Sequence, residues 1–384
     1  MKKKKVFVGL SGGVDSAVSA AILKKKNYEV VGVFIKTWHP DFLICNEEEE
    51  RRDAMRVAAF LDIPFLAFDF EDVYKKEVAD YMIREYKAGK TPNPDVMCNK
   101  EVKFGIFLKK ALSMGADYIA TGHYARVSGA GNSFSREYPA SHRHHSKKYS
   151  LLRSPDNTKD QSYFLWTLKQ EQLKKILFPI GHLKKTKVRK LAKKFNLPVA
   201  EKKDSQGICF LGAVDLKEFL KHYIKSKKGK VLDEKGEEIG FHDGVAFHTL
   251  GERHGFTITK KSPAGGPYYI VGKNVKKNIL IASQIPPDKG GQRGVEFKKP
   301  LPTSPYQGRL KIQIENTNWI TKVPNPKKTY TAQIRYHGEF LPCKVICAKS
   351  NFAQVIFEKP ILVASGQSCV VYDKDICLGG GVVV

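Results

Sequence analysis

The 384-residue chain contains no pair of cysteines at Cys-x-x-Cys spacing and no apolar run long enough to cross a membrane. The first absence argues against a zinc ribbon or a cysteine-ligated iron–sulfur cluster. Seven cysteines in a chain of this length fit reduced thiols better than a disulfide scaffold. A basic start, Lys2 to Lys5, precedes an apolar run of residues 6–10 that is too short for a signal peptide. We therefore expect a cytoplasmic protein with no membrane partner.

Acidic residues are few. Asp and Glu number 39 against 66 Lys and Arg, which gives a net charge of +27. Such an excess repels itself in a folded chain, and its commonest use is to meet a polyanion. Many lysines stand in helical runs such as residues 24–26, where a solvated face explains them equally well. The charge favours a nucleic-acid partner, but a solubilising surface or a lysine-rich genome would produce the same excess.

The first part of the chain alternates the patterns of strands and helices. Short apolar runs are followed by stretches with apolar residues at helical spacing. Strands separated by helices of this length predict an α/β fold with a doubly wound parallel sheet, whose ligand site lies at the carboxyl ends of the strands. The expected strands are 6–10, 30–35, 64–70 and 118–120, and the expected helices include 47–61, 73–87 and 104–114.

The remainder of the chain has a different texture. A helix is expected at 214–224, and glycine, proline and short alternating segments follow it. We expect a first domain at 1–206 with a polar loop insertion near 128–148, a small central domain at 207–289, and a C-terminal antiparallel β-barrel at 290–384. The barrel strands are predicted at 306–315, 330–335, 341–347, 353–357 and 368–372.

The most specific motif is Ser-Gly-Gly-Val-Asp-Ser at residues 11–16, between the first expected strand and helix. Glycines let the backbone approach an anion closely, and the N–H groups at a helix start supply positive potential. Asp15 is a candidate magnesium ligand. The other common phosphate motif, G-x-x-x-x-G-K-[ST], is absent, because Arg84 stands where Gly89-Lys90 would require a glycine. Kinase and GTPase chemistry is therefore disfavoured.

Two further strings contain cysteine. Pro-Asn-Pro-Asp-Val-Met-Cys-Asn occupies 92–99, and Asp-Ser-Gln-Gly-Ile-Cys-Phe occupies 204–210. Taken alone, each is compatible with a rigid turn or apolar edge that holds an incidental buried cysteine.

Taken together, these strings resemble the bacterial-type tRNA 2-thiouridylases of the PP-loop ATP pyrophosphatase superfamily. Matching stretches also occur at 121–126, 159–164, 366–368 and 375–381, and the resemblance covers essentially the whole chain. The sequence departs from the family pattern in a longer polar stretch at 128–148 and at two single positions, Gln206, where threonine is common, and Glu252, where glutamine is common.

The resemblance implies the site residues. Asp15 would help hold Mg²⁺, with no other protein ligand to a metal. Cys98 would be the nucleophile and Asp95 its acid–base partner. Cys209 would carry a persulfide and form a transient disulfide with Cys98. ATP would be bound by Gly9, Leu10, Ser11, Gly12, Gly13, Val14, Asp15, Ser16, Ile35 and Gly122.

The implied substrate is the wobble uridine, position 34, of a tRNA, and the implied sulfur source is an upstream donor protein. The target uracil would contact Asn93, Pro94 and Asp95. The remaining tRNA contacts would be His123, Lys159, Asp160, Gln161, Arg335, Tyr336 and Gln367.

The expected reaction is chemically coherent. The 2-oxygen of uracil is a poor leaving group, so ATP would adenylate it, releasing pyrophosphate and later AMP. A persulfide then needs one thiol to carry sulfur and a second to resolve it, and the base must be splayed out of its stack.

Two other hypotheses about the function remain. A PP-loop ligase for a small molecule leaves Cys98, Cys209 and the net charge without a purpose. A non-catalytic RNA-binding protein would bind tRNA without releasing AMP.

Overall fold

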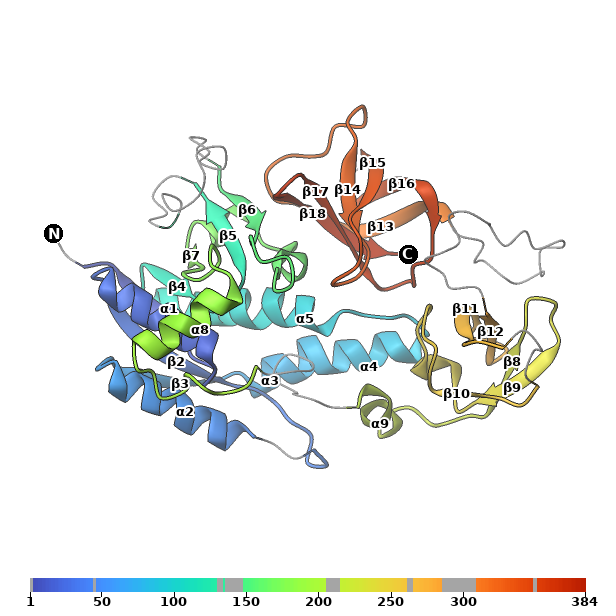
Figure 1. Ribbon diagram of the computed structural model, residues 1–384, viewed down its shortest axis with the longest axis horizontal. Helices are drawn as coiled ribbons and strands as arrows, with labels where there is room; N and C mark the ends of the chain where they lie inside the picture. Colours follow the sequence, from blue (N-terminus) through green and yellow to red (C-terminus); the bar gives the residue numbers. More distant parts are fainter. Residues whose placement is uncertain are drawn as a thin grey trace.

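The structure is a computed structural model, and Figure 1 shows how the strands of its three sheets are arranged. The two predicted domain boundaries, at 206/207 and 289/290, fall outside the residues that the structure describes, as do Cys209 and most of the predicted insertion. The described residues are 3–43, 46–129, 134, 148–204, 215–260, 265–284, 309–347 and 351–384.

The first sheet is parallel, with strand order β3-β2-β1-β4-β7, which confirms the predicted doubly wound fold. The chain starts in the middle of the sheet, builds outward in one direction and then crosses to the other side of β1. The crossing creates a switch point between β1 and β4, where open α/β sheets bind ligands. The strands are β1 (Lys5–Gly9), β2 (Glu29–Lys36), β3 (Phe65–Asp69), β4 (Tyr118–Ala120) and β7 (Ile176–Leu177).

Both faces of this sheet are covered by helices. In β1, Val6 and Val8 belong to one apolar core while Phe7 belongs to the other, as the alternation of strand side chains requires. Because both faces are buried, the strands are apolar nearly throughout. The first core contains α1 (Val14–Lys25), α2 (Glu47–Phe60) and α8 (Lys185–Lys194).

Two long helices, each with a wider π-type segment inside it, cover the opposite face. The prediction placed the start of the second at 104, but it begins at Pro94. Proline is favoured in the first helical turn, and the Asn93 side chain caps the helix, so the string at 92–99 is a helix start. The first helix joins α3 (Glu71–Tyr74), η1 (Lys75–Ala79) and α4 (Asp80–Lys87), and the second joins α5 (Pro94–Met97), η2 (Cys98–Ile106) and α6 (Phe107–Ser113).

The central region forms a separate five-stranded sheet in the order β10-β9-β8-β12-β11, around Val231, Ile270 and Leu280. The helix expected at 214–224 is present as α9 (Leu216–Lys221), and its Asp215 cap accepts hydrogen bonds from two backbone N–H groups. The strands are β8 (Gly229–Leu232), β9 (Glu238–His242), β10 (Phe256–Ile258), β11 (Tyr269–Asn274) and β12 (Ile279–Ser283), with a 3-10 turn η6 (Val245–Phe247) between β9 and β10.

The C-terminal region is an antiparallel barrel, as predicted, but it has six strands, because β18 adds to the five that were expected. It closes because β13 pairs with β16 on one side and with β18 on the other. The strands are β13 (Arg309–Trp319), β14 (Tyr330–Gln333), β15 (Leu341–Cys347), β16 (Phe352–Ile361), β17 (Ser368–Asp373) and β18 (Ile376–Val383).

A hairpin from the first region extends the barrel sheet. Its strands, β5 (Ala125–Ser128) and β6 (Ser150–Arg153), flank the predicted insertion, and β6 pairs with β18. Figure 1 shows this hairpin reaching toward the barrel. The segment that connects β6 to β7 contains η5 (Ser162–Leu165) and α7 (Gln170–Leu173).

Buried hydrogen bonds join η5 to the barrel. The Tyr163 hydroxyl donates to the Ser368 carbonyl at 2.9 Å, the Trp166 indole N–H donates to the Ser368 hydroxyl at 3.1 Å, and the hydroxyls of Ser162 and Tyr372 lie 3.2 Å apart. Val370, Tyr372 and Cys377 of the barrel belong to the same apolar core as the helices below the first sheet. The barrel and the first region therefore share a core. None of the helices in the described residues is long and apolar enough to span a membrane.

We expect Tyr372→Ala to lower the free energy of unfolding by about 4 kcal/mol, because the ring is fully buried in the shared core. Barrel and first region should still unfold in one transition, measured by circular dichroism and tryptophan fluorescence. The control, Phe352→Ala, alters a ring that is 52% exposed and should cost about 0.5 kcal/mol or less. Two separate transitions in the wild-type chain would contradict the shared core.

Candidate active site

The predicted phosphate loop lies where the sequence indicated, between β1 and α1. Ser16 ties the loop together: its hydroxyl donates to the Gly13 carbonyl at 3.0 Å and accepts from the Ser11 N–H at 3.2 Å. Gly12 has a φ of +69°, and a Cβ there would lie 2.4 Å from the Glu50 carbonyl oxygen. Gly13 is the N-cap of α1 without a side chain of its own. The loop is therefore preformed, with the helix N–H groups at the carboxyl end of β1.

Gly122 brings the end of β4 into contact with this loop. A Cβ on Gly122 would lie 2.8 Å from both the Asp15 carbonyl carbon and the Ser16 nitrogen. No side chain fits there, so only glycine allows the two backbones to meet at the switch point. Ile35, at the end of β2, is 7% exposed, and Leu10 and Val14 are buried. The loop of residues 11–16 and Gly122 therefore lie in contact, as predicted. That they bind ATP remains a prediction.

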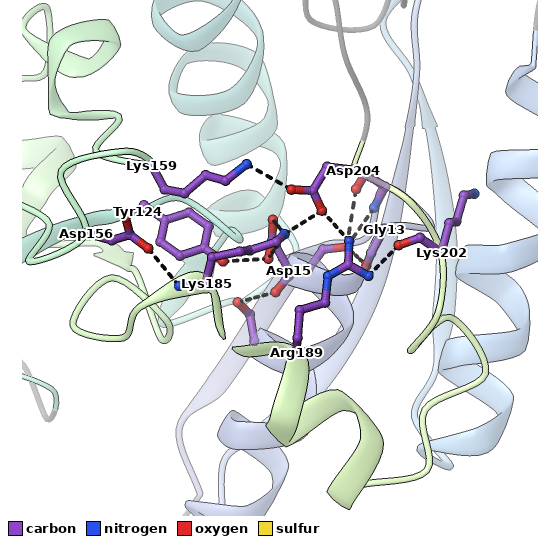
Figure 2. A network of polar contacts seen from close by, with 12 residues as sticks. Gly13, Asp15, Tyr124, Asp156, Lys159, Lys185, Arg189, Lys202 and Asp204 are labelled. Atoms are coloured by element: carbon purple, nitrogen blue, oxygen red, sulfur yellow. Dashed lines mark hydrogen bonds and ion pairs between the residues drawn. The ribbon is translucent and has the colours of Figure 1, made fainter. Parts of the chain in front are cut away.

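Asp15 is held from two directions, as Figure 2 shows. Lys185, the first residue of α8, approaches both carboxylate oxygens at 2.8 Å, and the Tyr124 hydroxyl donates to one of them at 2.8 Å. Burial, and next the Asp15 charge, raise the pKa of Tyr124, so this hydroxyl remains a donor. The Asp156 carboxylate accepts the Lys185 backbone N–H at 2.8 Å, which fixes the start of α8.

The Asp204 carboxylate forms ion pairs with three basic side chains. Lys159 and Lys185 each lie 2.9 Å from its carboxylate oxygens, and Arg189 is paired with it directly. Partial burial raises the pKa of Asp204, but the hydrogen bonds from the two lysines outweigh burial and hold the pKa well below its usual range. The carboxylate is therefore ionised and stands beside Asp15 (Figure 2).

The predicted target-base residues form the start of α5. The Asn93 side chain accepts the Val96 N–H at 3.1 Å, and the Asn99 amide donates to the Asp95 carbonyl at 2.9 Å. Cys98 is completely buried at the start of η2, whereas Asp95 is half-buried. Residues three apart in a helix share a face, so the carboxyl and the thiol emerge one turn apart.

The barrel places Tyr336 beside this helix start. Burial raises the pKa of Tyr336 to about 12, and the charges of Asp160 and Asp95 add to that rise. Its ring centroid lies 4.3 Å from that of Phe164. Arg335 is exposed next to it. The structure therefore places Tyr336 of the barrel within the electrostatic influence of Asp95, although the two residues lie in different domains.

Other predicted tRNA contacts have internal partners. Asp160 is buried and accepts hydrogen bonds from Arg153, Ser154 and Ser162. The Gln161 side chain accepts the Tyr124 N–H at 2.9 Å, and the Gln367 side chain accepts the Ala364 N–H at 3.1 Å. Each of these side chains orders a backbone segment, and contact with tRNA stays a prediction for them, as it does for Lys159.

His123 lies deepest among the predicted contacts. Its Nδ1 is 2.8 Å from the Thr121 hydroxyl, and its ring packs against Phe104 and Phe178. Burial, and to a lesser degree the charge of Lys103, lower the pKa of His123 well below 6.5. The ring is therefore neutral at pH 7.

The barrel cysteines have an environment that suppresses thiol chemistry. Burial raises the pKa of Cys343 to about 12 and raises those of Cys369 and Cys377 further. Thiols in such surroundings are poor nucleophiles. Burial therefore gives these three thiols a structural place in the barrel; Cys45 lies outside the described residues.

Sequence reasoning missed Tyr124, Lys185, Arg189 and Asp204 as site residues. Tyr124 and Asp204 stand inside strings that had been noticed, so their position was a usable signal. Lys185 and Arg189 are two among many basic residues, and nothing in their local sequence separates them from a solvated helix face.

Three family models match the chain in succession. They are described as a tRNA methyl transferase HUP domain (residues 4–213), a tRNA methyl transferase PRC-barrel domain (217–284) and an aminomethyltransferase beta-barrel domain (309–383). Sheet, loop and matches define a HUP-domain protein with two appended β domains.

Full-length relatives define the family. The tRNA-specific 2-thiouridylase MnmA of Geobacillus thermodenitrificans is 42% identical, covering 99% of this chain and 94% of that protein. The tRNA-specific 2-thiouridylase MnmA of Listeria monocytogenes serotype 4b is 41% identical with the same coverage. The chain belongs to the tRNA-specific 2-thiouridylase family. A solved 4-thiouridine synthetase–RNA complex with bound ATP is a more distant match. It is 19% identical with a TM-score of 0.32, over 57% of this chain and 50% of that one.

We expect Gly122→Ala to weaken ATP binding more than tenfold and to cost about 1–3 kcal/mol of stability, because the new Cβ collides with loop backbone. Calorimetric titration with ATP and thermal unfolding measure the two effects. Gly9→Ala is the control for stability, since its Cβ would lie 3.8 Å from the nearest atom and should change stability by about 1 kcal/mol or less. Normal ATP affinity in Gly122→Ala would show that the loop tolerates displacement.

Acid should destabilise the protein before its carboxylates titrate. Burial lowers the pKa of His242 to about 4, and His123 is lowered in the same direction. In the unfolded chain the same two histidines bind protons near pH 6.5. Their contribution to the free energy of unfolding is therefore complete above pH 6.5, and it falls as the pH drops toward their pKa values in the folded protein. Between pH 6.5 and 5, His242 should remove about 2 kcal/mol of the free energy of unfolding, and His123 should lower it in the same direction.

Urea unfolding at pH 7 and pH 5 measures this loss. His123→Gln should show a smaller loss between the two pH values than the wild type, whatever its stability at pH 7. His254→Gln, which changes an exposed ring, should leave the difference between the two pH values unaltered. An unchanged difference in His123→Gln would mean that the ring is protonated in the folded state.

Proposed function

We propose that the protein catalyses the ATP-dependent 2-thiolation of uridine 34 in tRNA, producing 2-thiouridine, AMP and pyrophosphate. The observation that carries this proposal is the full-length relationship to proteins named tRNA-specific 2-thiouridylase. Two features of the structure support it: a preformed anion-binding loop at the switch point of the sheet, and an acid and a thiol one helical turn apart at the start of α5. The tRNA substrate implies a cytoplasmic enzyme.

ATP supplies the activation that uracil lacks. We propose that the loop of residues 11–16 and Gly122 bind ATP, with Ile35 against its adenosine part, so that the 2-oxygen of uracil attacks the α-phosphate and releases pyrophosphate. The helix N–H groups of α1 would neutralise phosphate charge there. Mg²⁺ commonly binds through one or two carboxylates together with substrate phosphates. Asp15 fits as that single carboxylate, and it would share its charge between the ion and Lys185.

The sulfur steps need two thiols. We propose that a persulfide on Cys209, loaded by an upstream donor protein, attacks C2 through its terminal sulfur and expels AMP. The Cys98 thiolate then attacks the inner sulfur of Cys209. This breaks the S–S bond, leaves the thiocarbonyl on the base and forms a Cys98–Cys209 disulfide, which a cellular thiol reductant must reopen. Asp95 would accept and return the proton in these steps.

The barrel would hold the RNA. We propose that Arg335 and Tyr336 contact the anticodon region while Asn93, Pro94 and Asp95 meet the flipped uracil, because the structure gathers Tyr336 and Asp95 into one place. Phe164 lies against Tyr336 and offers an apolar face beside it. The excess of 27 positive charges would add affinity for phosphates that weakens with salt.

Nucleoside mass spectrometry tests the function directly. The protein, incubated with tRNA, ATP, Mg²⁺ and a persulfide donor, should form 2-thiouridine and AMP in equal amounts. Cys98→Ser and Asp95→Asn should lower thiolation more than a hundredfold while leaving ATP and tRNA binding intact. Cys347→Ser, a half-buried barrel thiol, is the matched control and should retain full activity. ADP as the product, or AMP release independent of tRNA, would contradict the proposal.

A further inference from the structure

Asp204 is the meeting point of three cations. Lys159 approaches one carboxylate oxygen and Lys185 the other, each at 2.9 Å, while Arg189 pairs with the latter oxygen. Lys185 also spans the two oxygens of Asp15 at 2.8 Å. Figure 2 shows these side chains converging from α8, from the segment before η5 and from the loop of residues 11–16.

The position of the cations on α8 is unusual for a helix. Lys185 is the first residue of α8, and the first turn contains no acidic residue. Positive side chains at a helix start oppose the helix dipole and destabilise the helix unless an anion is present. Here Asp204, Asp15 and Asp156 supply the negative charge. The start of α8 therefore resembles an anion-binding site in which protein carboxylates take the place of the bound anion.

The same cations stand at the phosphate loop. Asp15, which Lys185 holds, lies in the first turn of α1, directly after the loop glycines. Arg189 follows Lys185 by one turn of α8, so both side chains lie on the same face of the helix. The Lys185 side chain is 14% exposed and that of Arg189 is 27% exposed, which makes them partly desolvated donors suited to phosphate oxygens.

Charge counting shows why Asp204 matters. Lys159, Lys185 and Arg189 contribute +3, and Asp15 and Asp204 contribute −2, so the five groups carry a net charge of +1. A triphosphate is attracted more strongly to this cluster once Asp204 has moved away, because the remaining four groups carry a net charge of +2. Nucleotide phosphates and the Asp204 carboxylate are therefore competitors for the same donors.

We propose that Asp204 is an internal counter-anion of the ATP site: its carboxylate holds Lys185 and Arg189 in the nucleotide-free protein, and the phosphates of ATP displace it from both. This inference rests on the proposed function, which puts ATP at the loop of residues 11–16. Asp204 then lowers the affinity for ATP and keeps the cations from pairing with other anions. Lys185 and Arg189 become phosphate-binding residues.

Calorimetric titration of the full-length protein with ATP tests the exchange. Asp204→Asn preserves the shape of the side chain and removes its charge, so the Kd for ATP should fall about tenfold. Asp204→Glu restores a carboxylate and should return the Kd toward the wild-type value. The Kd for adenosine, which has no phosphate, should change less than about twofold in either variant. Asp373→Asn is the matched control, since Asp373 is also a carboxylate paired with a lysine, Lys328, but lies in barrel strand β17, and it should change the Kd for ATP less than about twofold.

The outcomes separate the two proposals. Weaker or unchanged ATP binding by Asp204→Asn would mean that Asp204 merely orients the cations, and an equal effect of Asp373→Asn would mean general charge repulsion; either overturns the exchange. Absence of ATP binding by the wild type and every variant would instead overturn the proposed function. Lysine acylation of the wild-type protein, read by mass spectrometry, needs no variant. ATP, but not adenosine, should protect Lys185 and leave Lys202, which pairs with Asp53, unchanged, and unprotected Lys185 at saturating ATP would also overturn the exchange.

Discussion

The N–H groups at the first turn of α1 have no partner within their own helix, and the loop of residues 11–16 is organised around them. A helix start needs acceptors from side chains, water or a ligand. Here Gly13 caps α1 without a side chain, and Ser16 uses its hydroxyl within the loop. No side chain therefore caps the first turn of α1, and Gly122 lies against the backbone of Asp15 and Ser16. An anion is a suitable partner for N–H groups at such a helix start.

The second constraint is the core that the barrel shares with the helices of the first region. Tyr163, Trp166 and Tyr372 bury both apolar surface and hydrogen bonds at this junction, and an unmade bond there would be expensive because no water can replace it. The junction fixes the barrel rigidly enough to bring Tyr336 beside Asp95. A site assembled from two domains in this way depends on packing at some distance from its own residues.

Local patterns predicted the parallel sheet, the loop of residues 11–16 and the barrel, because each depends on short-range periodicity or on glycine in a tight turn. They did not predict that α5 starts at Pro94, although Asn93 and Pro94 are favourable at a helix start, because the two prolines were interpreted as a stiff turn. They also could not predict the pairing of β6 with β18. Ile376 and Leu152 pair across most of the chain, and nothing in either segment specifies its partner. The convergence of Lys185, Arg189 and Asp204 depends on the packing of α8 against α1 and was equally invisible.

The distribution of charge explains how so basic a protein keeps a selective site. Most of its lysines face solvent, where salt screens them and single ion pairs contribute little. At the loop, by contrast, each cation is paired with a carboxylate and partly removed from water. Under the proposed exchange, a ligand must satisfy the N–H groups of α1 as well as the cations before it replaces the carboxylates. The internal ion pairs would then favour an anion that fits the loop over other anions that the basic surface attracts.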